Sequence, residues 1–402
     1  MTYDRRFVFA AACLGMLVFG IVLTLLGAIL PALIERFGVD KSTAGSLLSL
    51  MSIGILTGSV VFGPIADRFG YKMLLIVCTA LIFLGVEGIA FAPDLGWLRA
   101  AVFVVGFGGG IINGGTNALV ADISEEGRGA GLSILGVFFG IGAFGLPLAL
   151  GFLISHFSFS ELMGALGILV LVPLLFVALI GFPQPKQAQG FPLREGLALL
   201  KEPVLLLFGL MLFLQSGIEI TSGGWTTTYF GEVLALPPDR ALFFLSLFWL
   251  GLIIARLLLG ILLRRAAPAR MLLICLGTAF VGVVLLLAST GLLLAAPGIF
   301  LLGAGLAGGF PIVLGFVGDR YPHLSGTAFG IVLVMALTGG SVLPYVAGVL
   351  GEAFGLRTSF LILPVALVLM AMLLGLAVRR MAGAPPHSHS SSTTSHARKD
   401  LA

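Results

Sequence analysis

The chain carries a succession of apolar runs that are each long enough to cross a lipid bilayer as a helix. Such a helix needs about 20 mainly apolar residues. Only 10% of the 402 residues are charged, whereas soluble domains carry about 25%. No run shows the short alternating segments of a membrane β-barrel, so we predict an all-α membrane protein with twelve transmembrane helices. The spans are expected near 7–34, 43–66, 72–92, 97–121, 129–155, 160–182, 203–230, 240–263, 268–290, 294–317, 325–350 and 357–378.

One long polar connection, at 183–202, divides the spans into two sets of six. A repeat supports this division, because a shift of 197 positions superimposes seven landmarks of the two sets. Parallel repeats imply two halves related by an axis along the membrane normal, with a solute site between them near the midplane. The matched pairs are Gly63 and Gly260, Gly106 and Gly303, Gly108 and Gly305, Asp122 and Asp319, Gly129 and Gly326, Pro147 and Pro344, and Gly151 and Gly348.

These features predict four segments. An N-terminal six-helix half covers 1–182, a cytoplasmic linker 183–202, a C-terminal six-helix half 203–380, and a disordered cytoplasmic tail 381–402. The tail is rich in serine and threonine and has no periodicity, as is typical of disorder. Its His387 and His389 could bind a metal, but a solvated tail is the simpler interpretation.

The distribution of basic residues predicts the orientation. With the N-terminus inside, the inner loops and tails hold sixteen lysine and arginine residues and the outer loops hold five, a strong positive-inside bias. We therefore expect both termini to be cytoplasmic, in the cell inner membrane. The basic residues are spread over short loops, which argues against a nucleic-acid partner. We expect a monomer whose partners are the bilayer and a small-molecule solute.

The remaining composition argues against an enzyme or a metalloprotein. Cys13, Cys78 and Cys275 fall inside spans without partners at motif spacing, so we expect neither a disulfide framework nor a metal site. No nucleophile–base pair and no nucleotide-binding motif is present. Transport by this chain would therefore run on ion gradients, and no cofactor is expected apart from a coupling ion, H⁺ or Na⁺.

The loop after the second span reads GPIADRFGYK, Gly63 to Lys72. It resembles the G-x-x-x-D-R-x-G-x-R/K signature of the major facilitator superfamily, which implies that fold, transport by alternating access and a cytoplasmic gate in these loops. The alternative is that basic loop residues merely fix the topology. The gate residues that the resemblance implies are Gly63, Asp67, Arg68, Gly70, Lys72, Asp122, Arg128, Asp319 and Arg320.

Two further charges fall inside predicted spans. Arg256 could extend its guanidinium toward the inner surface or pair with a gate carboxylate such as Asp319. We favour structural pairing over solute binding and count Arg256 among the predicted gate residues. Glu87 lies in the third span, about 22 Å from its inner end, where packing is the favoured role.

Polar residues in the fourth and seventh spans are the candidate solute ligands. Asn113 and Asn117 are one helical turn apart and share a face, although asparagine can also join helices to each other. In the seventh span, Gly223 and Gly224 are expected to weaken the helix as a hinge, and Trp225 either stacks on a sugar or anchors at the interface. A stripe at 4-3-4-3 spacing contains Gln215, Glu219, Ser222, Thr226 and Tyr229. Weaker candidates are Tyr345 and Thr24.

The seventh span also carries a narrower resemblance. The run Gly217-x-Glu219-x-x-x-Gly223-Gly224-Trp225-x-x-x-Tyr229 is similar to the seventh helix of the fucose–galactose–glucose:proton symporters and their sodium–glucose relatives. That resemblance implies a monosaccharide substrate. Two acidic positions of those symporters align with Gly27 and Asn113 here, which leaves Glu219 as the coupling candidate.

The sequence therefore predicts a secondary active transporter for a small polar solute, with a monosaccharide as the favoured class and H⁺ or Na⁺ as the coupling ion. Asn113, Asn117, Gln215, Glu219, Trp225, Tyr229 and Tyr345 are the predicted solute ligands. One alternative is a multidrug or metabolite efflux antiporter, which would need a more aromatic and apolar cavity. Another is a membrane sensor that keeps a transporter fold without transporting.

Overall fold

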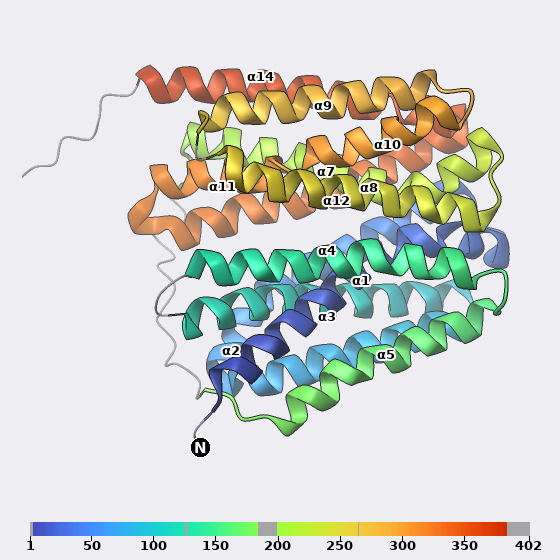
Figure 1. Cartoon of the computed structure of the whole chain (residues 1–402), viewed down its shortest axis with the longest axis horizontal. Coiled ribbons are helices and arrows are strands. Elements are labelled where there is room, and N and C mark those ends of the chain that lie inside the picture. The colour runs from blue at the N-terminus through green and yellow to red at the C-terminus, as the bar shows by residue number, and fades with distance from the viewer. Residues whose placement is uncertain (1–2, 125–127, 184–198, 264, 384–402) are drawn as a thin grey trace, which may run out of the picture.

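The computed structural model describes residues 3–124, 128–183, 199–263 and 265–383, and these form a bundle of long helices (Figure 1). Eleven helical segments of the described residues are long and apolar enough to cross a membrane. One of them, α2, has 50 residues and is interrupted at Gly70, whose φ of 78° is left-handed backbone that favours glycine. Since α2 crosses twice, the predicted twelve spans are confirmed.

The bounds agree closely with the predicted spans. The tenth span is broken into two helices, α10 and α11, and the twelfth begins with the short helix α13 before α14. The first six spans are α1 (Arg5–Phe37), α2 (Lys41–Ala90), α3 (Leu95–Ile123), α4 (Arg128–Leu153) and α5 (Phe159–Leu179). The others are α7 (Pro203–Leu234), α8 (Pro238–Leu262), α9 (Pro268–Ala288), α10 (Leu292–Leu306), α11 (Gly309–Arg320), α12 (Ser325–Phe354), α13 (Leu356–Ser359) and α14 (Ile362–Gly383), with the short helix η1 (Pro322–Leu324) before α12.

Two observations bear on the continuity of the helices. Gly223 and Gly224 were expected to weaken the seventh span, but α7 runs unbroken from Pro203 to Leu234. The tail was expected to start at 381, whereas α14 continues to Gly383. The linker and tail themselves, 184–198 and 384–402 with His387 and His389, lie outside the described residues.

Helices α1–α5 pack mainly on one another, and so do α7–α14 (Figure 1). We call these sets the first half and the second half. The halves meet chiefly where α2 packs on α12, α4 on α8, and α1 on α7.

The repeat in the sequence corresponds to repeated helix contacts. A Cβ built on Gly106 would collide with the backbone oxygen of Met51, and one on Gly303 would collide with that of Phe248, 197 positions further along. Each contact is a close backbone approach of the kind that small residues allow in membrane helices. Four glycine pairs at this spacing make equivalent contacts: Gly54 and Gly251, Gly85 and Gly282, Gly106 and Gly303, and Gly108 and Gly305.

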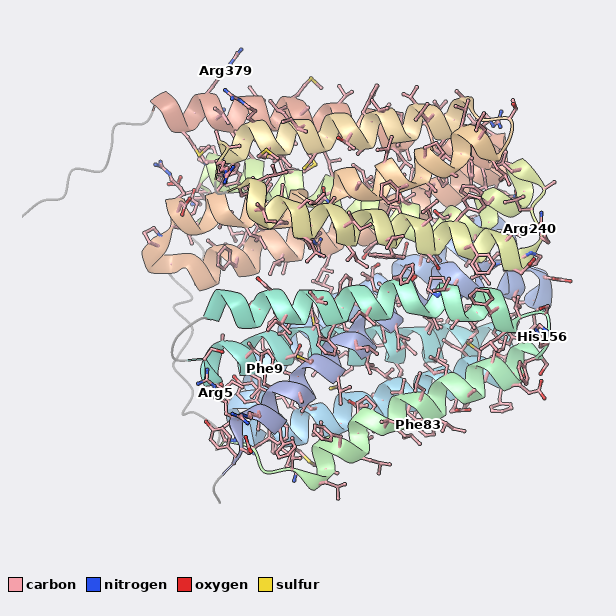
Figure 2. The ribbon with its side chains drawn as sticks, in the orientation of Figure 1. Arg5, Phe9, Phe83, His156, Arg240 and Arg379 are labelled. Atoms are coloured by element: carbon pink, nitrogen blue, oxygen red, sulfur yellow. The ribbon has the colours of Figure 1, made fainter. Side chains whose placement is uncertain are left out.

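The two ends of the bundle differ. Arg5 and Arg379 lie at one end, and His156 and Arg240 at the other (Figure 2). We call the end with Arg5 and Arg379 the basic end. The interruption of α2 at Gly70, with Arg68 just before it, also lies there. The other is the opposite end.

Between the described side chains, the hydrogen bonds and ion pairs that join the halves run from mid-membrane to the opposite end. Lys41 pairs with Glu232 at 3.3 Å, and its backbone N–H donates to Glu352 at 2.9 Å. The other such bonds are Ser49 to the Ser341 oxygen, Ser52 to the Gly340 oxygen and Thr227 to the Gly27 oxygen. The halves are therefore held together at the opposite end.

The glycine contacts predict a contrast between two alanine substitutions. Gly303→Ala should destabilise the second half, because its Cβ meets the Phe248 backbone and overpacking of this kind costs about 1–3 kcal/mol. Gly277→Ala is the matched control, because nothing lies within 4 Å of a Cβ there. Thermal unfolding of the detergent-solubilised variants should show a lower Tm for the first substitution alone. Equal Tm values would contradict the packing described here.

Candidate functional site

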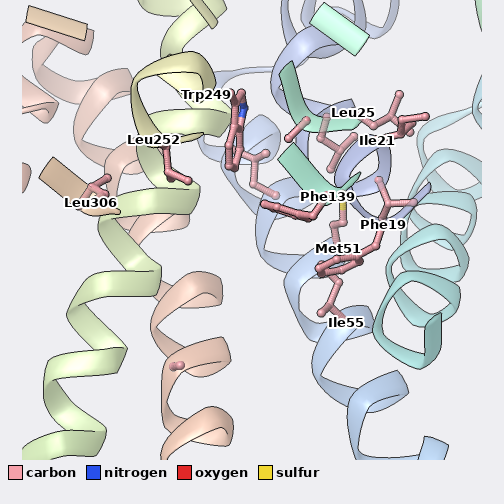
Figure 3. Packing of buried hydrophobic residues seen from close by; sticks show 14 of the residues in the cluster. Phe19, Ile21, Leu25, Met51, Ile55, Phe139, Trp249, Leu252 and Leu306 are labelled. Atoms are coloured by element: carbon pink, nitrogen blue, oxygen red, sulfur yellow. The ribbon is translucent and has the colours of Figure 1, made fainter. Parts of the chain in front are cut away.

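A small cavity lies between the two halves, at the middle of α1, α2, α7 and α8. A mainly apolar wall with a few polar groups is typical of small-molecule sites. Trp249 of the second half points toward Phe139, Met51 and Ile55 of the first half (Figure 3). The cavity is lined by Leu23, Leu26, Leu48, Met51, Ser52, Ile55, Glu219, Ile220, Gly223, Gly224 and Trp249.

The cavity lies on the repeat axis of the protein. Several lining residues form pairs at the 197-residue spacing: Leu23 with Ile220, Leu26 with Gly223, and Ser52 with Trp249. Equivalent positions of two repeats can line one cavity only where the repeats face each other. A cavity therefore lies between the halves, where the sequence predicted the solute site, and most of its wall is apolar.

Glu219 is the carboxylate of this wall. It is only 7% exposed, and the Gln215 amide donates to it at 3.3 Å. The same amide donates to the carbonyl of Leu306 at 2.9 Å. Leu306 is the last residue of α10, where the tenth span breaks, and a side chain on Gly309 just after the break would collide with Gln215. Gln215 therefore links the break to the carboxylate and does not line the cavity.

Arg256 is the charge that interacts electrostatically with Glu219. No direct ion pair joins the two in the described part of the chain, where Lys41 and Glu232 form the salt bridge between the halves. The sequence suggested that Arg256 pairs with a gate carboxylate such as Asp319, and the structure instead gives it Glu219 as its electrostatic partner. Arg256 follows Trp249 by two helical turns, on the same face of α8.

The rest of the polar stripe of α7 faces the interior of the second half. Tyr229 is fully buried, donates to the Leu286 oxygen at 3.3 Å and packs on Phe360 at 4.4 Å between ring centroids. The hydroxyl of Thr226 donates to the Ser222 oxygen one turn back. The 4-3-4-3 spacing predicted one polar stripe toward the solute, whereas the part of α7 that lines the cavity is Glu219, Ile220, Gly223 and Gly224.

Trp225 neither lines the cavity nor anchors at the interface. Its ring is fully buried, and its N–H donates to the Pro344 oxygen of α12 at 3.0 Å. The aromatic side chain in the cavity wall is Trp249, which sequence reasoning missed. The repeat could have found it, since Trp249 is the counterpart of Ser52.

The remaining candidate ligands lie outside the cavity wall. The Asn117 amide donates to the side chain of Asn113 at 3.1 Å and to its backbone oxygen at 2.8 Å, so the two do share a face. Gly110, one turn before Asn113, contacts Ile55 of the cavity wall. Tyr345 is 43% exposed, and the buried hydroxyl of Thr24 has no hydrogen-bond partner among the described residues.

Glu87 packs against the last span of the first half. Its carboxylate lies over Gly167 of α5, where a side chain would collide with it. This contact agrees with the packing role that the sequence favoured for Glu87.

The loop residues of the predicted gate lie in contacts within one half or at the surface. Tyr71 donates to Asp122 at 2.7 Å, and Lys72 donates to the Ile180 oxygen at 2.8 Å, both inside the first half. Asp67, Arg68 and Asp319 are exposed, Arg320 is half-buried, and Gly63 has open space around it. The side chain of Arg128 lies outside the described residues. The bonds of Tyr71 and Lys72 at the basic end thus stay within one half, in contrast to those of Lys41 at the opposite end.

Comparison with known proteins agrees with this architecture. Residues 12–336 and 244–401 match the sequence model of the Major Facilitator Superfamily. The chain is 23% identical to the uncharacterized MFS-type transporter YfkL of Bacillus subtilis, over 85% of this chain and 88% of the relative. It is 22% identical to the glucose/mannose transporter GlcP of the same organism, over 82% and 84%. The structure of a mutant form of the nucleoside transporter NupG superposes with a TM-score of 0.80, covering 92% of this chain and 99% of that one at 16% identity.

The positions of the tryptophans predict which of them reports solute binding. The chain has three: exposed Trp97, buried Trp225 in the α7–α12 contact, and Trp249 in the cavity wall. A solute that raises the Tm of the purified protein should also change its intrinsic fluorescence saturably. We expect Trp225→Phe to keep this change and Trp249→Phe to lose most of it. Loss of the fluorescence change in Trp225→Phe, with the change kept in Trp249→Phe, would instead place the solute at Trp225, as expected from the sequence.

Proposed function

Because the chain belongs to the major facilitator superfamily, we propose that it is a secondary active transporter that moves a small polar solute by alternating access. The observation that carries this proposal is the cavity on the repeat axis, which contains one carboxylate, Glu219, in an otherwise mainly apolar wall. An ionisable residue inside a membrane is costly and by default marks a solute or ion pathway. We further propose that the protein is a monomer in the cell inner membrane, with both termini cytoplasmic.

The contacts between the halves support a two-state cycle. In the present state the Lys41–Glu232 pair and the neighbouring bonds hold the opposite end shut. For the solute to pass, these contacts break while the basic end closes. In this proposal Asp67, Arg68, Asp122, Arg128, Asp319 and Arg320 then join the halves at the basic end as the cytoplasmic gate, and Gly63, Gly70 and Lys72 shape its loop.

A monosaccharide is the solute class we propose first. The face of Trp249 can pack on a sugar ring, and Glu219 and Ser52, in the same cavity wall, can accept hydrogen bonds from hydroxyl groups. The similarity to GlcP supports the same class. Asn113 and Asn117, on the side of the basic end, would contact the solute on its way in or out.

One observation favours the second candidate, an efflux antiporter for less polar compounds. Most of the lining side chains are apolar, among them Leu23, Leu26, Met51 and Ile55. The carboxylate at the centre would then exchange a proton against the exported compound instead of moving with the solute.

Glu219 is the proposed coupling residue, and it gives the test of transport. Protein reconstituted in liposomes should accumulate a solute under a pH or Na⁺ gradient. Glu219→Gln should reduce the accumulation ratio to about one, because the amide cannot bind the ion, while counterflow exchange of labelled solute persists. Unchanged accumulation would rule out coupling at Glu219. Absence of saturable flux for every sugar tested would rule out the monosaccharide.

A further inference from the structure

The pair of charges inside the second half has no counterpart in the first. Positions 197 residues earlier than Glu219 and Arg256 hold Val22 and Ser59. The helix contacts around these positions nevertheless recur in both halves, as at Gly54 and Gly251 or Gly106 and Gly303. The fold therefore forms the same packing with and without the charges, and packing alone does not explain them.

Two buried hydrogen-bond donors on one face of α8 have no partner among the described residues. The Nε of Arg256 is buried and has no hydrogen-bond partner among the described residues, and the same holds for the Nε1 of Trp249. Trp249 is only 2% exposed and lines the cavity. Arginine carries five N–H donors and no acceptor, and a buried donor without a partner is costly. A ligand that supplies acceptor oxygens would satisfy both groups.

Building on the proposed transport function, we infer that the solute is an organic monocarboxylate whose carboxylate binds Arg256 and whose body packs against Trp249. The planar guanidinium matches a carboxylate with two parallel hydrogen bonds. The apolar wall formed by Leu23, Leu26 and Met51 suits the uncharged part of such a solute. A sugar acid of monosaccharide size satisfies both requirements.

The electrostatics of the site then couple the solute to a proton. Arg256 carries one positive charge, and Glu219 is the acidic side chain that interacts with it electrostatically. When the carboxylate of the solute binds Arg256, two negative charges would share one positive charge in a low-dielectric site. Glu219 then takes up one proton from solvent and becomes a neutral acid. One carboxylate and one proton cross together, and the process is electroneutral.

No other charge of the packed helices replaces Arg256 in this exchange. Among the described residues, the charge that acts on Glu219 is that of Arg256, and the charge that acts on Arg256 is that of Glu219. The other described charged side chains of the helices that contact α7 and α8 lie toward helix ends or beside the interruption of α2 at Gly70. They are Arg5, Arg6, Glu35 and Arg36 of α1, Lys41, Asp67, Arg68, Lys72 and Glu87 of α2, Asp319 and Arg320 of α11, Glu352 of α12, Arg357 of α13, and Arg379 and Arg380 of α14. On α7 and α8 themselves they are Glu232, Asp239 and Arg240.

The test compares each carboxylate with its neutral analogue on the purified full chain. The probe pairs are glucuronate with glucose, benzoate with benzyl alcohol, and lactate with propane-1,2-diol, measured by titration calorimetry in weakly buffered solution with a pH indicator. In at least one pair the carboxylate should bind more than about tenfold tighter, as expected for hydrogen bonds to a charged group. Its binding should take up about one proton per site.

Variants separate carboxylate binding by Arg256 from proton uptake by Glu219. Arg256→Gln should remove the preference for the carboxylate, whereas Arg240→Gln, at the other end of α8, should leave it intact. Glu219→Gln should still bind the carboxylate but take up no proton. If Arg256→Gln does not fold, as judged by size-exclusion chromatography, Arg256→Lys is used, which keeps the charge but loses the paired hydrogen bonds and should weaken carboxylate binding selectively.

Binding of a neutral analogue as tightly as its carboxylate in every pair, or of none of the carboxylates, would overturn the inference. So would carboxylate binding without proton uptake. These results are distinct from failure of the proposed function, which would appear as no saturable flux of any solute in liposomes. Flux of a neutral sugar with accumulation that depends on Glu219 would keep the proposed function and reject the carboxylate.

Discussion

Inside a bilayer no water is available to the backbone, so each peptide group must find its partner within the protein. This constraint makes the chain helical throughout its spans, and it makes any break conspicuous. The break between α10 and α11 meets it through Gln215, whose amide donates to the Leu306 carbonyl and also to Glu219. A backbone irregularity and the central carboxylate thus share one hydrogen-bond donor, so movement of the broken span would alter the surroundings of Glu219.

The second organising feature is a repeat whose packing is symmetric and whose charges are not. Glycine pairs such as Gly54 and Gly251 make the same close contacts in both halves. Glu219 and Arg256, however, replace Val22 and Ser59 of the first half. The first half thus offers a mainly apolar wall, and the second half carries the groups that would bind the solute and the coupling ion. This division explains how one repeated arrangement of helices can form a site whose two sides differ chemically.

The sequence predicted the spans and the repeat because hydropathy and glycine spacing act directly on helix formation and packing. It also singled out Glu219, which lies in the cavity wall, since a lone acid in an apolar run stands out. It misplaced Trp225 and Tyr229, because spacing along α7 defines a face but not the helix that the face meets. It missed Trp249, which looks like an ordinary core residue until it is paired with Ser52. The partner of Arg256 and the break in the tenth span depend on tertiary contacts that periodicity does not contain.

The central claim is that two halves rock about a cavity between them. Spin labels at Arg5 and Arg379 would report on the basic end and labels at His156 and Arg240 on the opposite end (Figure 2), in a background without Cys13, Cys78 and Cys275. Pulsed electron–electron double resonance would measure both distances with and without a solute that binds. The account predicts that a population appears in which the first distance is shorter and the second longer. Distances that change in the same direction, or do not change at saturating solute, would contradict it.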